Sequence, residues 1–179
     1  MFKSRTLLTA GIAATILVVG YSAHVLATAV NGNSVSAQIV TPINVATGTA
    51  LNFGVVSNDP VLTSTVSINP TDNSVSTTNG ASAISGQTRA DFALSGGVTS
   101  ANYTVNFTTT TPIDITASGC GACPANSVTI SALTWDSVGG GTLDGLGADT
   151  LWVGGTLTMT SAATGGTYSG TYNMDVVYN

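Results

Sequence analysis

The sequence predicts an all-β protein built as an antiparallel β-sandwich. After an N-terminal apolar run, almost every segment alternates apolar and polar side chains with a period of two, as strands with one buried face do. Clusters of Gly, Pro, Asn and Asp separate these segments at short intervals, which is typical of sandwich proteins. No segment beyond the apolar run combines helical periodicity with helix-capping residues. These observations favour strands over helices throughout the domain.

The N-terminus has the features of a secretory signal peptide. Lys3 and Arg5 give a positively charged start, and residues 7–19 are apolar apart from Thr and Gly. Small residues mark a cleavage site after Ala27, and residues 35–37 offer a second one. The alternative is that the same apolar run is an uncleaved membrane anchor, because about 20 apolar residues span a bilayer.

Cleavage at the first site gives a signal peptide at residues 1–27, a polar leader at 28–36 and one domain at 37–179. The domain is long enough to bury a core of its own, and no repeat or linker divides it. We therefore expect an exported protein that meets a membrane only through its signal peptide. Whether it stays in the periplasm, at the cell surface or outside the cell is open.

The composition of the mature chain excludes most chemistry. The formal net charge of the whole chain is −5, although this includes Lys3 and Arg5 of the signal peptide; Arg89 is the only basic residue after Ala27, and Lys, His and Glu are absent there. Nucleic-acid binding needs clustered Lys and Arg, so no nucleic-acid partner is expected. Catalysis relies mainly on residue types that are missing here. We therefore expect no enzyme activity and no cofactor; a hydrolase that uses Asp residues alone is an alternative without supporting spacing.

About nine short strands are expected from the alternation. They cover residues 35–45, 51–55, 61–68, 92–94, 103–107, 128–135, 151–153, 157–159 and 168–178. Gly154 and Gly155 separate two of them, which suggests a bend or a bulge. Residues 139–149 form the longest irregular stretch, which we interpret as a surface connection rather than a binding loop.

The last predicted strand is the longest and is a candidate edge strand. Its apolar face carries Tyr168, Tyr172, Met174, Val176 and Tyr178. An open edge exposes backbone donors and acceptors, and it can therefore accept a further strand.

The first predicted strand is the candidate for strand exchange. Its apolar face carries Val35, Ala37, Ile39, Ile43 and Val45. Pro42 lies within it, which disfavours a central strand and fits an edge strand or an added strand. Two pairings are open: in cis with the protein's own sheet, or in trans as a strand added to another subunit.

Cys120 and Cys123 are the only cysteines of the chain. A zinc site needs about four ligands, and no His or further Cys remains after the signal peptide to complete one. Because an exported chain favours oxidation, we interpret the pair as a local disulfide that pins a loop. An intermolecular cross-link and a labile redox bond are the alternatives.

The remaining polar and aromatic residues have structural interpretations. Most of the Asp residues lie near turns, where Asp is common, and the calcium-loop motif is absent, which leaves a calcium site as a minor alternative. Arg89 and Asp91 share one face of a strand and are expected to pair. Trp135 and Trp152 are expected to fill the core or a sheet corner rather than to form a sugar platform.

Four short motifs carry a resemblance to a known family. They are IVTPI at 39–43, LNFG at 51–54, VGGTL at 153–157 and GTYSGTY at 166–172. With these motifs the chain resembles an uncharacterised family of small secreted Gram-negative proteins. It is distantly similar to spore-coat-U-like and chaperone-usher pilin domains, which end in a Gly-x-Tyr strand with a penultimate Tyr, the position of Tyr178 here.

The resemblance implies an immunoglobulin-like sandwich and a role in a surface fibre. It also implies partners: other copies of the chain or sibling subunits, and a periplasmic chaperone with an outer-membrane usher. We therefore expect a structural subunit of a cell-surface fibre or coat that assembles by β-strand addition. The alternative is a self-contained, adhesin-like secreted module whose loops bind a glycan or a protein.

Overall fold

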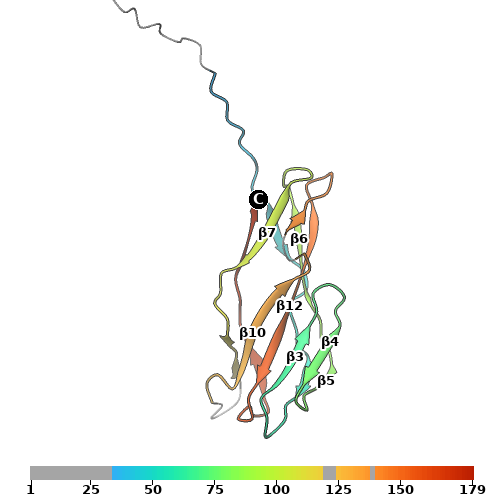
Figure 1. The fold of residues 1–179 in the computed structure, drawn as a ribbon, viewed down its shortest axis with the longest axis vertical. Helices are drawn as coiled ribbons and strands as arrows, with labels where there is room; N and C mark the ends of the chain where they lie inside the picture. Colours follow the sequence, from blue (N-terminus) through green and yellow to red (C-terminus); the bar gives the residue numbers. More distant parts are fainter. Residues whose placement is uncertain (1–33, 119–123, 138–139) are drawn as a thin grey trace, which may run out of the picture. The chain divides into compact units, whose positions relative to one another are not determined.

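A computed structural model describes residues 34–118, 124–137 and 140–179 (Figure 1). The chain divides into two units, residues 1–37 and 38–179, and every described strand lies in the second unit. The predicted signal peptide and most of the polar leader lie outside the described residues. No helix in the described part of the chain is long and apolar enough to cross a membrane.

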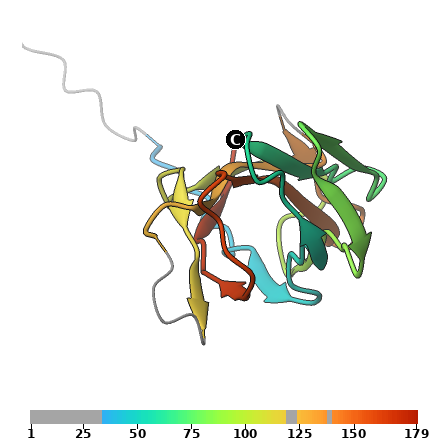
Figure 2. The same cartoon turned by 90° about the horizontal axis from the view of Figure 1, so that it is seen from below.

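The described residues form fourteen strands and no helix, and all strand pairs are antiparallel, which confirms the predicted fold class. In chain order they are β1 (Asn44–Thr47), β2 (Val55–Ser57), β3 (Ser64–Ile68), β4 (Val75–Thr78), β5 (Ser82–Ser85), β6 (Ala90–Ser95), β7 (Asn102–Phe107), β8 (Ile113–Asp114), β9 (Thr116–Ser118), β10 (Val128–Trp135), β11 (Gly141–Thr142), β12 (Asp149–Met159), β13 (Thr167–Ser169) and β14 (Met174–Tyr178). Seen along the domain, the strands curl around one interior (Figure 2).

The longest strand, β12, organises the main sheet, whose order is β1-β6-β12-β10-β8. One edge of β12 pairs first with β6, over residues 149–153, and then with β3, over residues 155–159. Its other edge pairs with β10, and β4 extends the sheet beyond β3. Because the two halves of β12 have different neighbours on one edge, the domain has two distinct ends along this strand.

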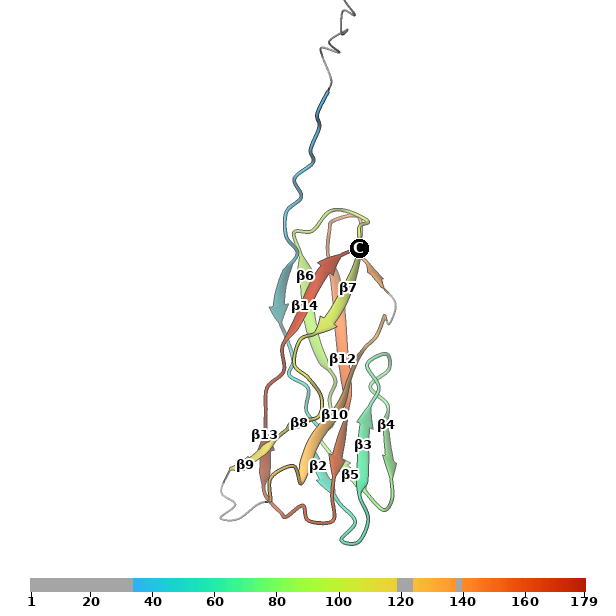
Figure 3. The same cartoon turned by 60° about the vertical axis from the view of Figure 1, so that its left-hand side comes forward.

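The second layer is divided in the same way. At the Asp149 end of β12, a three-stranded sheet of order β11-β7-β14 covers the main sheet. At the Met159 end lie two separate two-stranded sheets, β2-β5 and β13-β9. Figure 3 shows β7 and β14 toward one end of the domain and the two small sheets toward the other.

Two clusters of buried side chains fill the interior, one at each end. The first cluster lies at the Asp149 end and contains Ala90, Leu94, Tyr103, Val105, Trp135, Leu143, Leu151 and Val153. The second lies at the Met159 end and contains Val66, Ala81, Val128, Ile130, Leu157 and Met159. The half-buried Leu133 packs against both. Burial of this apolar surface is the main stabilising contribution to the fold.

Trp135 fills the first cluster, as the sequence suggests, while Trp152 does not. Trp135 is buried, and its ring centroid lies 5.9 Å from that of Tyr103. Trp152 is half-buried, and the Arg89 guanidinium stacks 3.7 Å from its ring centroid. Arg89 Nη1 also donates to the carbonyl oxygens of Pro70 and Thr71.

Arg89 and Asp91 were expected to pair, but each makes its main contacts with other residues. The Thr49 side chain and then the Thr49 backbone N–H, which donates to Asp91 Oδ1 at 2.8 Å, are the two largest causes that lower the pKa of Asp91. The charge of Arg89 is the smallest of the causes. Arg89 instead stacks on Trp152, because the aromatic face offers a partner that is less hydrated than an exposed carboxylate.

Strand β12 is continuous through Gly154 and Gly155, so the two strands predicted on either side of them are one strand. The irregularity lies in the partner strand β10, where the register shifts between Ile130 and Ala132. A Cβ at Gly154 would lie 2.2 Å from the Ile68 carbonyl oxygen. Gly154 is therefore explained by the close approach of β3, and not by the end of a strand.

Residues 140–149 are more ordered than a simple surface connection. Strand β11 begins the segment, and Leu143 is buried in the first cluster. Asp144 Oδ1 accepts from the backbone N–H groups of Leu146 at 2.8 Å and Ala148 at 2.9 Å. These two bonds close a compact loop, as Asp commonly does in turns.

Asp136 and Asp144 predict opposite effects of pH on stability. Burial raises the pKa of Asp136 above its usual value of 3.8, although its carboxylate accepts from Trp152 N at 3.2 Å. Backbone N–H donors hold the pKa of Asp144 below 3.8. The fold therefore disfavours the ionised form of Asp136 and favours that of Asp144.

We expect Asp136→Asn to raise the melting temperature at pH 7, because the amide oxygen still accepts from Trp152 while the buried charge is gone. This gain should disappear as the pH falls through the raised pKa, since wild-type Asp136 is then neutral. Asp144→Asn should lower the melting temperature at pH 7, and its deficit should vanish only below the unfolded value of 3.8. Thermal unfolding of both variants and wild type between about pH 7 and 2 tests this; shifts of the same sign at pH 7 would contradict it.

Candidate functional site

The structure forms only the end of the predicted first strand. Strand β1 begins at Asn44 and pairs in cis with β6. Ile43 is half-buried and packs against the first cluster, and Val45 lies within β1 with 39% of its surface exposed. The strand-exchange candidates Ile43 and Val45 are therefore parts of the protein's own domain.

The candidates before Ile43 lie outside any strand. Val35 and Ile39 are each 95% exposed, and Ala37 is exposed as well. Residues 34–41 nonetheless alternate polar and apolar side chains as far as Ile39, and Val40 is the one exception to this strand pattern. We call residues 34–41 the N-terminal segment. It has the sequence pattern of a strand, but it pairs with no described strand of its own chain.

Tyr178, the penultimate residue, holds Thr41 against the domain. Tyr178 Oη donates to the carbonyl oxygen of Thr41 at 2.9 Å and accepts from Val98 N at 2.9 Å. Thr41 Oγ1 donates to the carbonyl oxygen of Gly96, also at 2.9 Å. These bonds hold Thr41 at the Asp149 end of the domain, where β6 ends and β14 closes the chain.

The predicted C-terminal strand is in fact two strands in two sheets. Tyr168 lies in β13, which pairs with β9, whereas Met174, Val176 and Tyr178 lie in β14, which pairs with β7. The break falls at 170–173, where a Cβ at Gly170 would lie 2.6 Å from Ile115. Tyr172 lies in this break and packs edge-on against Phe107. Strand β14 is the last strand of its three-stranded sheet.

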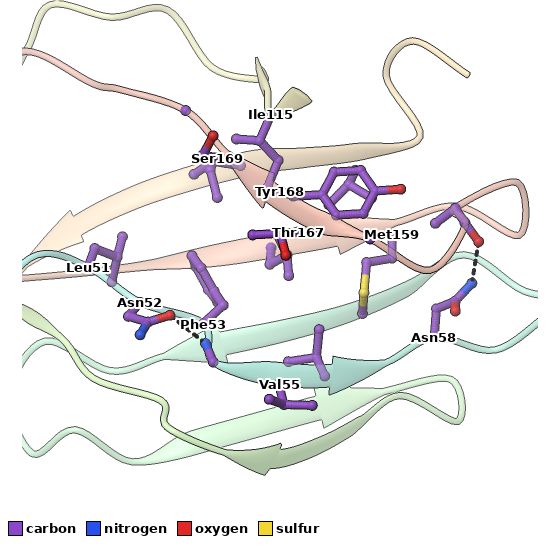
Figure 4. A pocket seen from close by; sticks show the side chains of 18 of the residues that line it. Leu51, Asn52, Phe53, Val55, Asn58, Ile115, Met159, Thr167, Tyr168 and Ser169 are labelled. Atoms are coloured by element: carbon purple, nitrogen blue, oxygen red, sulfur yellow. Dashed lines mark hydrogen bonds between the residues drawn. The ribbon is translucent and has the colours of Figure 1, made fainter. Parts of the chain in front are cut away.

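A groove of about 750 Å³ with an apolar floor opens at the Met159 end of the domain (Figure 4). Its floor belongs to the second cluster and comprises Val128, Ile130, Leu157 and Met159, with Ile113 beside them. One wall is the segment 51–56, and the other is the segment 163–172. The groove therefore lies where the second layer consists of two small sheets rather than one.

The first wall presents one of its two edges to the groove. Its other edge is satisfied: β2 pairs with β5, Asn52 forms a two-way bridge with Thr88, and Gln87 Nε2 donates to two wall carbonyls. Phe53 points from this wall toward the opposite one, and Val55 is 57% exposed (Figure 4). The groove side of β2 is thus an exposed strand edge beside an apolar floor.

One end of the groove is closed by Asn58. Its Nδ2 donates to the carbonyl oxygens of Thr160 at 3.4 Å and Ala163 at 3.5 Å, and so ties the first wall to the turn that leads into the second (Figure 4). Toward the other end the lining reaches Leu51 and Tyr172. Burial raises the pKa of Tyr172 to about 12, so its hydroxyl is neutral at physiological pH.

The groove lining contains no charged side chain. Its residues are aliphatic, aromatic, small or neutral polar, and the buried ones, Val128, Ile130, Leu157 and Met159, are aliphatic or Met. An ionic ligand would leave its charge without a partner in an apolar site. The groove is therefore suited to an uncharged occupant with an apolar face.

One family model matches residues 43–178, over most of the chain, and it describes the domain of unknown function DUF4402. The chain belongs to the DUF4402 family. The same comparisons found no matching curated protein and no matching solved structure. The DUF4402 match begins at Ile43, so it takes in β1 to β14 and the whole groove, and the N-terminal segment precedes it.

The described part of the DUF4402 domain has no group of three or more His, Cys, Asp or Glu side chains that could hold a metal ion. Cys120 and Cys123, for which a disulfide is predicted, lie outside the described residues. Asp59 and Asp144 accept from backbone N–H groups of turns, and Asp91 accepts from the side chain and backbone of Thr49; these bonds lower the pKa of each carboxyl. These carboxylates therefore have structural partners.

The groove was not predicted from the DUF4402 sequence. Its lining comes from five separate stretches, at 51–58, 85–86, 113–115, 128–130 and 157–172. Each stretch is ordinary strand or turn sequence when taken alone. The local signals were the motifs LNFG and GTYSGTY, which line opposite walls, and VGGTL, whose Leu157 lies on the floor.

Proposed function

We propose that this protein is an exported structural subunit of a cell-surface fibre or coat, and that it assembles by β-strand addition. The observation that carries the proposal is the N-terminal segment, whose apolar side chains alternate like those of a strand while Val35 and Ile39 are 95% exposed. Fully burying a Val or Ile side chain contributes roughly 1.5–3 kcal/mol. Adding the segment to a sheet outside its own domain would bury these side chains and so stabilise the assembled state.

Other features support this proposal. The chain resembles spore-coat-U-like and pilin domains in its closing motif and penultimate Tyr178. A pilin-like role brings the partners expected for it: further copies or sibling subunits, a periplasmic chaperone and an usher. Export also favours a Cys120–Cys123 disulfide, and the lack of His, Lys and Glu after Ala27 supports a non-enzymatic role.

The second candidate is a self-contained secreted binding module. It is favoured by β1, which pairs in cis with β6, and by the Tyr178 bonds that hold Thr41 to the same domain. In that case the groove binds a ligand with an apolar face. Such a protein is complete as a monomer.

Gel electrophoresis of material sheared from the cell surface separates the two candidates. We expect unboiled samples to give a ladder that collapses to one band on boiling, because strand-exchanged polymers dissociate slowly in detergent. A single monomer band in both lanes would refute the fibre proposal and favour the binding module.

A further inference from the structure

At the Met159 end the second layer of the sandwich is incomplete, and the groove is the gap in it. The second layer there consists of the β2-β5 pair on one side and the β13-β9 pair on the other, with apolar core side chains at the bottom of the gap. Two-stranded sheets are only marginally stable by themselves. A strand laid against β2 would turn the divided layer into a broader one and cover the second cluster.

We infer that this groove is the acceptor site for the N-terminal segment of a second copy of the chain, which pairs with the open edge of β2. The inference rests on the proposed function, which requires strand addition without saying where the strand is received. In this arrangement Val35, Ala37 and Ile39 face the floor, and Ser36 and Gln38 face solvent.

The groove and the N-terminal segment are chemically complementary. The groove lining has no charged side chain, and neither has the segment from Ser34 to Thr41. The floor residues Ile130, Leu157 and Met159 are aliphatic or Met, which suits the branched and small apolar side chains of the segment. The backbone edge of β2 supplies the hydrogen bonds that fix an added strand, as in other β-augmentation complexes.

The positions of the two surfaces favour a second copy over the same chain. Thr41 is bonded to Gly96 and Tyr178 at the Asp149 end of β12, while Leu157 and Met159 in the groove lie at the other end. From Asn44 the chain already runs along β6 toward the groove, where its residues 51–56 form a wall. A donor that starts at one end and an acceptor at the other make a head-to-tail contact, which repeats as an open filament.

Photocross-linking in the full-length chain tests this assignment. A photoreactive phenylalanine analogue replaces Ile39, which is 95% exposed, so the substitution leaves the monomer intact. The matched control carries the same analogue at Leu146, which is 85% exposed and lies in the loop closed by Asp144. Sheared fibres are irradiated, digested with chymotrypsin or an Asp-specific protease, and analysed by mass spectrometry, because Arg89 is the only tryptic site after the signal peptide.

We expect a dimer-sized product from the Ile39 probe, cross-linked to residues 51–58 or 157–172 of another copy, and no such product from the Leu146 probe. Fibres whose Ile39 cross-links fall on β14 or another surface would overturn the groove assignment and leave the proposed function intact. Cross-links to the groove of the same chain would overturn the second copy as the occupant. Absence of any fibre would overturn the proposed function, and the groove assignment with it.

Discussion

Replacing Ile39 with Asp should abolish fibre assembly and leave the folded monomer unchanged. In the monomer the Ile39 side chain is 95% exposed, so a carboxylate there costs the domain nothing. In the assembled state the variant loses the burial of an Ile side chain, roughly 1.5–3 kcal/mol, and places an unpaired charge against an apolar surface. We expect the unboiled ladder to be lost, with an association constant reduced by at least about 100-fold.

Leu146→Asp is the matched control for this prediction. Leu146 is a similarly exposed large apolar residue, and it belongs neither to the N-terminal segment nor to the groove. The Leu146→Asp variant should assemble like wild type. As monomers, Leu146→Asp and Ile39→Asp should have the same melting temperature. A normal ladder from Ile39→Asp, or equal defects in both variants, would mean that the N-terminal segment is not the donor.

Gly154→Ala should destabilise the domain by about 3 kcal/mol, close to the upper end of what overpacking usually costs. The added Cβ would lie 2.2 Å from the carbonyl oxygen of Ile68 and 2.8 Å from Pro70 Cδ. Ile68 ends β3 and pairs with Gly155, so the obstructing atom cannot move without disturbing the β3–β12 pairing. Chemical denaturation of the monomer measures the change in the free energy of unfolding.

Gly165→Ala controls for the general effect of replacing a glycine. A Cβ at Gly165 meets nothing within 4 Å, and its backbone has no conformation that favours glycine. We therefore expect a change within about 0.5 kcal/mol, as for most surface substitutions. If Gly154→Ala were equally mild, the close approach of β3 to β12 would not explain the glycine.

The second layer covers the main sheet fully at one end of the domain and only in part at the other. This difference supports the proposed strand addition. At the Asp149 end a three-stranded sheet covers the first cluster, and Leu151 and Val153 are fully buried beneath it. At the Met159 end the covering layer is split, and half-buried Phe53 and exposed Val55 line a groove. An exposed strand edge beside an apolar floor promotes pairing with other chains, which is a liability in a monomer and a means of assembly in a fibre subunit.

The period-two alternation predicted the central strands well. Strand β10 has the predicted bounds, and β7 and β6 differ from their predictions by a few residues at most. Each combines alternating apolar residues with flanking turn residues, so local sequence is sufficient to define it. The buried positions Leu94, Tyr103 and Val105 follow from the same alternation.

Strands β4 and β5 were not predicted, because their sequences VSTT and SAIS are rich in Ser and Thr and are largely exposed. They become strands by pairing with β3 and β2, which is a non-local effect. The single strand predicted over residues 168–178 was wrong for a related reason. Its alternation continues through the break, but the close contact of Gly170 with Ile115 separates β13 from β14.

The sequence by itself determined the fold class, most central strands, the apolar face of the N-terminal segment and the absence of charge around it, because all of these are local properties of the chain. Only the tertiary structure decided that Ile43 belongs to the domain's own core, that Gly154 marks the close approach of β3, and that a groove with an apolar floor opens over Leu157 and Met159. The groove depends on which strands stop short of one another in the second layer. That outcome is set by packing between segments up to a hundred or so residues apart, which the pattern within any one of them does not encode.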